Sequence, residues 1–360
     1  MAHLFYPSHD IALGNGVKHF NPPFAARRLE EDLCALADIW NTKYNMQDEK
    51  EGKILIPWGW DYDTRALLNK EYGIKLKNLP TDFELHQLRE LSSRKTTIEI
   101  LRRLKEKSNE YNNITIPKYL DSEEKLKNFI ESEENFVLKT PWSSSGRGLS
   151  RSSVCTKETL LKHGAATIRK MGGILAEKWY KKIQDFAMLF YVGKNEVKFV
   201  GYSIFDNDEA GTYRCGKLLS NKNIEALLPK SIDETKENIL EILNDIFSPF
   251  FNKSWEIGFI GIDMMTCKCN DLGENTNGII TIHPCVEMNL RCTMGVVARM
   301  YFDQNCEEDE TGEFFITPAL EHGKLLLHDR DLNEKHGERY RRLTNILPDS
   351  MFMAYTILNR

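Results

Sequence analysis

Residues 135–150 read NFVLKTPWSSSGRGLS, an apolar run followed by a loop rich in serine and glycine. The run predicts a strand over residues 135–141 with Lys139 near its end, where the lysine would point a cation into a cleft. Backbone N–H groups and hydroxyls of such a loop can close around phosphate oxygens. An ordinary turn is the alternative, because the Walker A spacing is absent. The loop consists of Ser143, Ser144, Ser145, Gly146, Arg147 and Gly148.

A second group of polar residues falls on two later apolar runs. Asp263 lies in GFIGIDMM, a run that would ordinarily exclude a carboxylate, and Glu287 and Asn289 lie in PCVEMNLR. Positions i and i+2 of a strand face the same side, so Glu287 and Asn289 project together, and pairing of the two strands could place Asp263 beside them. Three oxygen donors of this kind suit Mg²⁺. Polar positions that merely face solvent are the alternative.

Arg291 extends the same alternation to the pattern E-x-N-x-R. A guanidinium on that face could hold a carboxylate or stabilise an acyl phosphate beside a metal and its phosphates. A surface arginine without a role in the site is the alternative.

Residues 172–180, GGILAEKWY, predict a strand that runs into charged and aromatic residues. The backbone at this point could bind an adenine edge, and the rings could cover the adenine face. Asp185 could then accept hydrogen bonds from ribose hydroxyls. Plain packing is the alternative for the two rings. The candidate adenine-binding residues are Glu177, Lys178, Trp179 and Tyr180.

The composition is that of a globular protein with about two or three lobes, since the chain has 360 residues, of which 41% are apolar and 28% charged. Its 48 basic and 53 acidic residues are well mixed, which argues against a surface that coats nucleic acid. No apolar run approaches the roughly 20 residues that cross a membrane, and the N-terminus lacks the apolar stretch of a signal peptide. We therefore expect a cytoplasmic protein without nucleic-acid or membrane partners.

The eight cysteines are interpreted as reduced thiols, because a cytoplasmic protein is kept in a reducing environment. Cys267 and Cys269 form a C-x-C pair, and structural zinc at this pair is the alternative.

The remaining pattern predicts a mixed α/β chain. Short buried strands at 3–7 and 53–57, with helices over 25–40 and 64–72, would form a small N-terminal α/β lobe. Asp121 is predicted to cap a helix that runs through Phe129. The other predicted elements are helices over 82–107 and 232–247, a helical tail from about 333, an extended piece at 116–120, and strands at 173–180, 185–192, 196–206, 257–265 and 278–289.

The order of the candidate residues along the chain is more specific than any one of them. That order is Lys95 in SSRKTT, Lys139 with its loop, Glu177, Asp185, Asp263, Glu287 and Asn289. The ordered set resembles the ATP-grasp superfamily, which includes D-alanine–D-alanine ligase, glutathione synthetase and biotin carboxylase, over about residues 90–295. The resemblance implies an α/β ATP-grasp fold, with an N-terminal lobe at 1–88, a lid subdomain at 89–171, a C-terminal subdomain at 172–330 and a helical tail at 331–360.

The resemblance also implies a nucleotide site. Lys95 and Lys139 match two lysines that contact ATP phosphates, and residues 143–148 match a flexible loop that closes over them. Residues 177–180 match the adenine hinge, and Asp185 matches the ribose-binding acid. The magnesium ligands match Asp263, Glu287 and Asn289, with Mn²⁺ as an alternative metal.

Three further residues are implied as catalytic. Arg291 matches an arginine that serves the carboxylate substrate, and Lys217 in YRCGKLLS resembles a lysine that meets the terminal phosphate. Gly261 stands where related ligases have a catalytic arginine, and Arg214 or Arg291 would compensate for it.

The activity implied is that of a ligase, which uses ATP and Mg²⁺ to activate a carboxylate as an acyl phosphate and joins it to an amine. Its partners would be small-molecule or peptide carboxylates and amines, and a homodimer is one alternative for its assembly. A phosphotransferase with the same nucleotide site and a nucleotide-binding module without catalysis are the competing hypotheses. His9, Asp10 and Asn15 could line the acceptor site, with helix capping and turn formation as the alternative.

Overall fold

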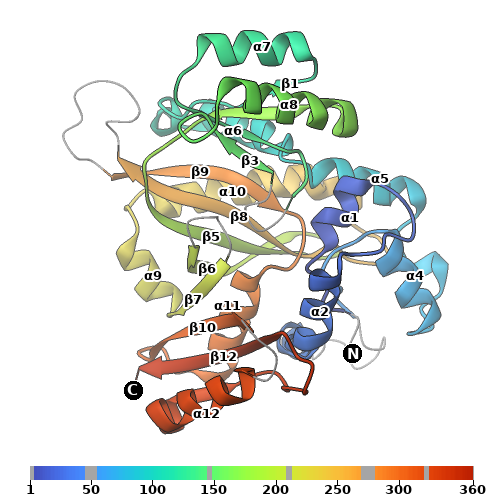
Figure 1. Ribbon diagram of the computed structural model, residues 1–360, viewed down its shortest axis with the longest axis vertical. Coiled ribbons are helices and arrows are strands. Elements are labelled where there is room, and N and C mark those ends of the chain that lie inside the picture. Colours follow the sequence, from blue (N-terminus) through green and yellow to red (C-terminus); the bar gives the residue numbers. More distant parts are fainter. Residues whose placement is uncertain are drawn as a thin grey trace.

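The computed structural model describes residues 4–44, 55–143, 148–207, 213–268, 280–319 and 324–359. Two antiparallel sheets organise this part of the chain, one of four strands and one of eight. Figure 1 shows the smaller sheet with its helices at one end of the molecule, and the helical N-terminal region beside the larger sheet.

The N-terminal region is built from helices. The segments predicted as strands at 3–7 and 53–57 form no strand where the structure describes them, and the N–H of Trp58 donates instead to the carbonyl of Leu4 at 3.0 Å. Phe5, Trp40 and Trp58 pack together there, with ring centroids 5.0 to 6.5 Å apart. The helices are α1 (His9–Asn15), α2 (Phe24–Leu33), α3 (Ala37–Tyr44), α4 (Tyr62–Lys70), α5 (Asp82–Leu91) and α6 (Thr96–Lys107).

Both long helices predicted in this region are interrupted. The one predicted over 25–40 is divided into α2 and α3 by a 3-10 turn at Cys34–Leu36. The one predicted over 82–107 is divided into α5 and α6 by residues 92–95. In that break the N–H of Arg94 donates to the carbonyl of Pro141 at 2.9 Å. The break therefore joins the helical region to the start of the serine- and glycine-rich loop.

The small sheet pairs β1 (Lys118–Leu120), β4 (Ile174–Lys178), β2 (Phe136–Lys139) and β3 (Leu149–Arg151) in this order. The helices α7 (Glu123–Ser132) and α8 (Lys157–Met171) pack on it over a separate apolar core to which Phe136 and Leu138 belong. Because side chains alternate along a strand, Lys139 points to the opposite face of the sheet. Ser122, rather than the predicted Asp121, caps α7, since its hydroxyl accepts from the N–H of Lys125 at 3.2 Å.

The large sheet has the order β11-β12-β10-β7-β6-β5-β8-β9. Its central strands coincide closely with the predicted ones, and α10 occupies the predicted range 232–247. No helix within the described ranges is long and apolar enough to cross a membrane. The strands are β5 (Lys182–Val192), β6 (Val197–Asn207), β7 (Tyr213–Leu218), β8 (Gly258–Lys268), β9 (Ile280–Asn289), β10 (Thr311–Pro318), β11 (Tyr340–Arg342) and β12 (Phe352–Asn359), and the helices are α9 (Asn221–Leu227), α10 (Ile232–Phe247), α11 (Met294–Asn305) and α12 (Lys324–His336).

Two of the predicted subdomain limits differ from the structure. The limit at 171/172 would separate β4 from the small sheet, in which β4 pairs with both β1 and β2. The tail at 331–360 is not simply helical, because α12 ends at His336 and β12 then pairs along its length with β10. This eight-residue strand is buried by pairing with β10 on one side and β11 on the other, which the sequence pattern of the tail alone did not indicate.

We expect Phe247→Ala to lower the free energy of unfolding by about 3–5 kcal/mol, because the side chain is fully buried at the end of α10 and its removal leaves a cavity. Denaturant unfolding measures the change. The matched control is Phe83→Ala, whose ring is 69% exposed and whose loss should cost less than about 1 kcal/mol. Equal losses in both variants would contradict the described core.

Candidate active site

The pairing of β8 with β9 brings the predicted metal ligands together. Asp263 stands directly opposite Glu287, and Gly261 stands opposite Asn289. Residues opposite each other on neighbouring strands share a face, so both carboxylates lie on one side of the sheet. The amide Nδ2 of Asn289 donates to Oδ2 of Asp263 at 2.9 Å. The antiparallel pairing of these two strands that the sequence predicted is thus present, and it brings all three side chains together.

The electrostatics of this group suit a cation. Burial, together with the negative charge of Glu287, raises the pKa of Asp263 to about 7. The described residues contain no cluster of three or more His, Cys, Asp or Glu side chains that could hold a metal. Two carboxylates and one amide would fill only part of the octahedral shell of Mg²⁺ and leave the other positions to phosphate and water oxygens. Mg²⁺ is usually bound in this way beside phosphates.

Arg94 is a site residue that the sequence reasoning missed. Its Nη2 donates to Oε2 of Glu287 at 2.9 Å, and its Nη1 donates to the hydroxyl of Ser143 at 2.7 Å and to the carbonyl of Thr140 at 2.8 Å. The side chain is only 6% exposed. A signal was available, because the apolar stripe of α6 at Ile98 and Leu101 leads back by one helical turn to position 94.

Lys95, which was predicted to contact phosphates, does not lie with this group. Its ammonium lies over the ring of Tyr119, 4.8 Å from the centroid, on an exposed surface beside β1. Neighbouring positions at the start of a helix point about 100° apart. Arg94 and Lys95 therefore cannot both reach Glu287, and the buried position belongs to the arginine.

Lys139 and Glu177 form an ion pair across β2 and β4, on the face of the small sheet away from its helices. Lys139 is 7% exposed. Burial and the charge of Lys139 together lower the pKa of His283, on β9, to about 3. The charge on the small sheet therefore lies close to the strand that carries Glu287.

Carboxylates of both sheets lie near Cys285. Burial raises the pKa of Cys285, on β9, to about 12, and the charges of Asp263, Glu177 and Glu287 contribute to the increase. Asp185 lies on β5, two residues from Ala187, the residue that pairs with Asp263. Its charge also contributes to the raised pKa of Asp263. The predicted ribose-binding acid thus lies in the same neighbourhood as the predicted metal ligands.

The predicted adenine hinge begins in the last two residues of β4 and ends at Tyr180, which contacts the large sheet. The ring of Tyr180 packs against His283 with centroids 5.1 Å apart, and its hydroxyl accepts from the N–H of Thr115 at 2.8 Å. Trp179 donates from its backbone to Asn135 at 3.0 Å. Tyr180 therefore serves in packing between the sheets, and Lys178 lies over its ring, 5.5 Å from the centroid.

Arg291 connects the metal group to the N-terminal region. Its Nε donates to Oδ2 of Asp10 at 2.7 Å, its Nη2 to Oδ1 of Asn289 at 3.0 Å and its Nη1 to the carbonyl of Cys292 at 3.1 Å. Burial works against ionisation of Asp10, but the charge of Arg291 and the contacts with His9 outweigh it and hold the pKa at about 2. Arg291 therefore orients Asn289 and is itself held by α1.

Two predicted catalytic residues lie apart from the group. Gly216 pairs with Phe205, which in turn pairs with Asp185, so these three residues share the sheet face that carries Asp263. Lys217, the next residue of β7, therefore faces the other side of the sheet. There Lys217 pairs with Glu313 and Asp206. Arg214 is exposed on the same strand, and no contact with the metal group is seen for it within the described ranges. The departure of Lys217 follows from strand alternation, which the sequence pattern of β7 did not reveal.

Part of the predicted phosphate loop lies outside the described residues, namely Ser144, Ser145, Gly146 and Arg147. The two ends of the loop are described. Gly148 has φ of +73°, and an added Cβ would come within 2.3 Å of the Thr140 hydroxyl. Its carbonyl accepts from the N–H of Thr140 at 3.0 Å. Glycine is therefore required where the chain returns from the loop.

No protein-family model and no curated protein sequence matches the chain. Among solved structures, it is similar to an ADP complex of N5-carboxyaminoimidazole ribonucleotide synthetase, with a TM-score of 0.51 and 14% identity over 83% of this chain and 73% of that chain. It is also similar to the biotin carboxylase domain of 2-oxoglutarate carboxylase from Hydrogenobacter thermophilus, in complex with MgADP, ADP and bicarbonate, with a TM-score of 0.50 and 13% identity over 84% of this chain and 69% of that chain. The chain has the ATP-grasp fold.

The ATP-grasp fold predicted from the order of the polar residues is thereby confirmed. At identities of this size, a structural likeness establishes the fold alone. The roles of individual residues depend on the contacts described above.

We expect the metal-free protein to lose stability as the pH rises from about 4 to about 7. The folded chain holds the pKa of Asp263 at about 7, above its ordinary value of 3.8, so the folded state binds the proton more tightly than the unfolded state across this window. Asp263→Asn removes the titrating group and should flatten this part of the profile. Denaturant unfolding in the presence of a chelator, at pH 5 and pH 8, measures both proteins.

The same pH profile in wild type and Asp263→Asn would refute this account of Asp263. Asp121→Asn serves as the control, because that carboxyl is exposed and its substitution should leave the loss between pH 4 and pH 7 in place.

Proposed function

We propose that the chain is an ATP- and Mg²⁺-dependent ligase that activates a carboxylate as an acyl phosphate and joins it to an amine. The observation that carries the proposal is the alignment of Asp263 with Glu287 on one face of the large sheet, close to the Lys139–Glu177 pair of the small sheet. In an ATP-grasp fold, this is a place where a nucleotide can lie between two sheets with its phosphates toward a metal.

Asp263, Glu287 and Asn289 are the residues that would hold Mg²⁺. The donor set fits the ion, because two carboxylates face each other, and burial together with their repulsion raises the pKa of Asp263 to about 7. A divalent cation would relieve that repulsion. When bound, the metal neutralises phosphate charge. The geometry of ligand oxygens is already constrained, since Asn289 is hydrogen-bonded on one side to Asp263 and on the other to Arg291.

Lys139 and Arg94 would bind the phosphates. Lys139 is nearly buried and paired with Glu177, so a phosphate oxygen would enter a site where a charge-assisted contact is poorly screened. Arg94 already holds Ser143, at the start of the loop, and Glu287, a proposed metal ligand. We propose Arg94, in place of Lys95, as the residue that joins loop and metal at the phosphates.

Arg291 can still contact a carboxylate or an acyl phosphate. A guanidinium has five N–H groups, and three are used by Asp10, Asn289 and the carbonyl of Cys292, which leaves two for a ligand. Arg291 forms an ion pair with Asp10, which keeps the guanidinium oriented when no substrate is present. Arg291 is thus proposed to stabilise negative charge beside the metal group.

The reaction needs no nucleophilic side chain. The substrate carboxylate takes the terminal phosphoryl group of ATP and releases ADP, and the amine then attacks the acyl carbon and releases phosphate. Burial of Lys139, Asn289 and Arg94 would limit water that could hydrolyse the intermediate. A screen for phosphate release over pooled carboxylates and amines, with product mass, tests the proposal. A stable phosphorylated product without free phosphate would indicate a phosphotransferase instead.

We expect Glu287→Gln to abolish Mg²⁺-dependent turnover in the substrate pool that is active with wild type. The neutral amide removes one negative charge from the proposed metal ligands and leaves Arg94 without its carboxylate partner. Phosphate release measures turnover, and circular dichroism checks the fold. Glu241→Gln is the matched control, since that carboxylate is 71% exposed on α10. Turnover that survives in Glu287→Gln would remove the metal assignment.

We expect Lys139→Ala to weaken MgATP binding by about tenfold or more, because it removes a buried charge-assisted contact. Isothermal titration calorimetry measures the affinity without any knowledge of the substrates. Lys95→Ala is the matched control and should change the affinity by less than about threefold, as this lysine is exposed over Tyr119. If Lys95→Ala shows the larger effect, the phosphates do not lie where we propose.

A further inference from the structure

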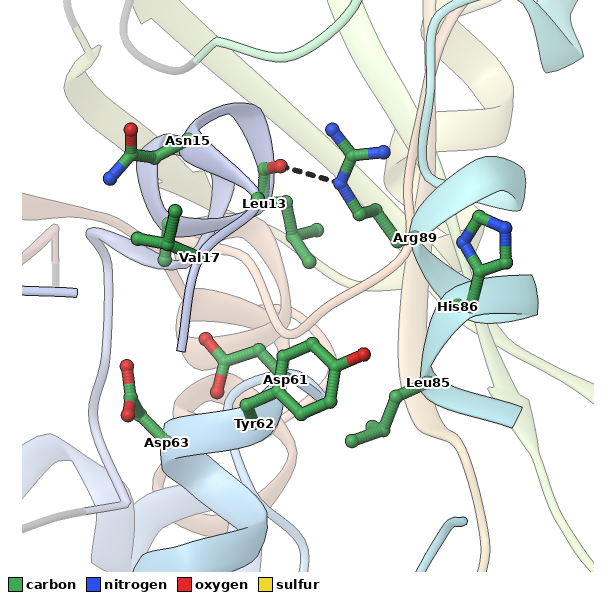
Figure 2. A pocket seen from close by; sticks show the side chains of 11 residues that line it. Leu13, Asn15, Val17, Asp61, Tyr62, Asp63, Leu85, His86 and Arg89 are labelled. Carbon is green, nitrogen blue, oxygen red and sulfur yellow. Dashed lines mark hydrogen bonds between the residues drawn. The ribbon is translucent and has the colours of Figure 1, made fainter. Parts of the chain in front are cut away.

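A cavity of about 370 Å³ opens in the N-terminal region, beside the candidate site. Figure 2 shows its wall, to which the end of α1, the start of α4 and one side of α5 contribute. Leu13 and Leu85 line it with side chains that are at most 5% exposed, whereas Val17 and His86 are exposed at its edge. The cavity therefore has a buried apolar part and an open side, and its volume suits a small molecule.

The buried part of the cavity also contains a carboxylate with an unused oxygen. Asp61 is 6% exposed, and its Oδ1 accepts from the N–H of Thr64 at 2.7 Å, which caps α4. Its Oδ2 is buried and has no hydrogen-bond partner in the described part of the chain. Burial raises the pKa of this carboxyl. An unpaired buried carboxylate oxygen is costly, and a cationic donor would relieve that cost.

The other charges of the cavity are engaged. Asp63 accepts from the N–H groups of His19 and Phe20 at 3.1 and 2.9 Å, and so adds negative charge without an unused oxygen. Arg89 donates to the carbonyl of Leu13 at 2.8 Å and lies over the ring of Trp142, 3.9 Å from its centroid. Among the described residues that line the cavity, the buried polar atom without a partner is thus an acceptor, which favours a ligand that donates hydrogen bonds and carries positive charge.

We propose that this cavity binds a primary amine, with its ammonium group on Asp61 and its apolar stem along Leu13 and Leu85. The ring of Tyr62 also lines the cavity and adds apolar surface, since Lys18 and Arg65 already lie over it, 4.8 and 5.5 Å from its centroid. A divalent metal fits less well, because it needs several oxygen ligands and the cavity supplies one carboxylate oxygen that is not already used. An ammonium group, with three N–H donors, needs fewer oxygen partners than a divalent metal does.

The cavity and the candidate active site share helix α1. Asp10 of this helix holds Arg291, and Leu13, one turn later, lines the cavity. An amine bound here would therefore lie beside the helix that positions an arginine of the metal group. A role as the site of the acceptor amine rests on the function proposed above, whereas amine binding itself does not.

Binding of n-butylamine to the full chain, followed by NMR or calorimetry without nucleotide, tests the cavity. We expect n-butylamine to bind at least about tenfold more tightly than butan-1-ol, which has the same stem without the charge. Asp61→Asn keeps an oxygen to cap α4 but removes the charge, and should weaken amine binding by about tenfold. Asp121→Asn, an equal change at a 52% exposed carboxyl far along the chain, should bind as wild type does.

Val17→Trp provides a second variant at the open edge, where the side chain is 53% exposed and the fold does not depend on it. It should weaken amine binding by obstructing the cavity. Equal binding of amine and alcohol, unchanged binding in Asp61→Asn, or displacement of the amine by Mg²⁺ alone would each overturn the proposal. Because no nucleotide is present, failure here is distinct from failure to find phosphate release, which would instead count against the ligase.

Discussion

The register between β8 and β9 is the constraint on which the candidate site depends. It sets Asp263 opposite Glu287, and a slip by one residue would turn Glu287 to the other face of the sheet. The slip is opposed by Ile262 and Met288, which pair on the other face and are buried there. Burial of Asp263 and, after it, repulsion between the two carboxylates raise the pKa of Asp263 to about 7. The fold therefore maintains an electrostatic cost at one point, which is a common property of sites that bind cations.

Two arginines connect that point to the rest of the molecule. Arg94 joins Glu287 to the start of the serine- and glycine-rich loop, and Arg291 joins Asn289 to Asp10 in the N-terminal helices. Both guanidinium groups are largely buried, so loss of either partner would leave an uncompensated charge. The helical region is thus attached to the proposed metal site by charge pairs as well as by apolar packing. In the same way, the unused carboxylate oxygen of Asp61 gives the cavity beside α1 its preference for a cation.

Much of the fold could be predicted because its elements carry strong local patterns. The apolar alternation around Asp263 and around Glu287 indicated two strands, and the amphipathic run at 232–247 indicated α10. The N-terminal strands at 3–7 and 53–57 were wrong because short apolar runs bury equally well as irregular segments around Trp58. β12 was missed because its burial depends on β10, a distant part of the chain. Within the site, Lys95 and Lys217 were misplaced because a cation next to the correct position in sequence can face the opposite direction.

The sequence by itself determined the order of the polar residues along the chain, the strand that carries Lys139 and the spacing of Glu287, Asn289 and Arg291 on one face, because these depend on local periodicity. Only the tertiary structure decided that Arg94 reaches Glu287, that Arg291 is held by Asp10, and that Asp61 borders a cavity with an unused oxygen. Each of these contacts joins residues or elements that are distant in sequence. Their partners are selected by packing and burial, which leave no periodic signal in the sequence.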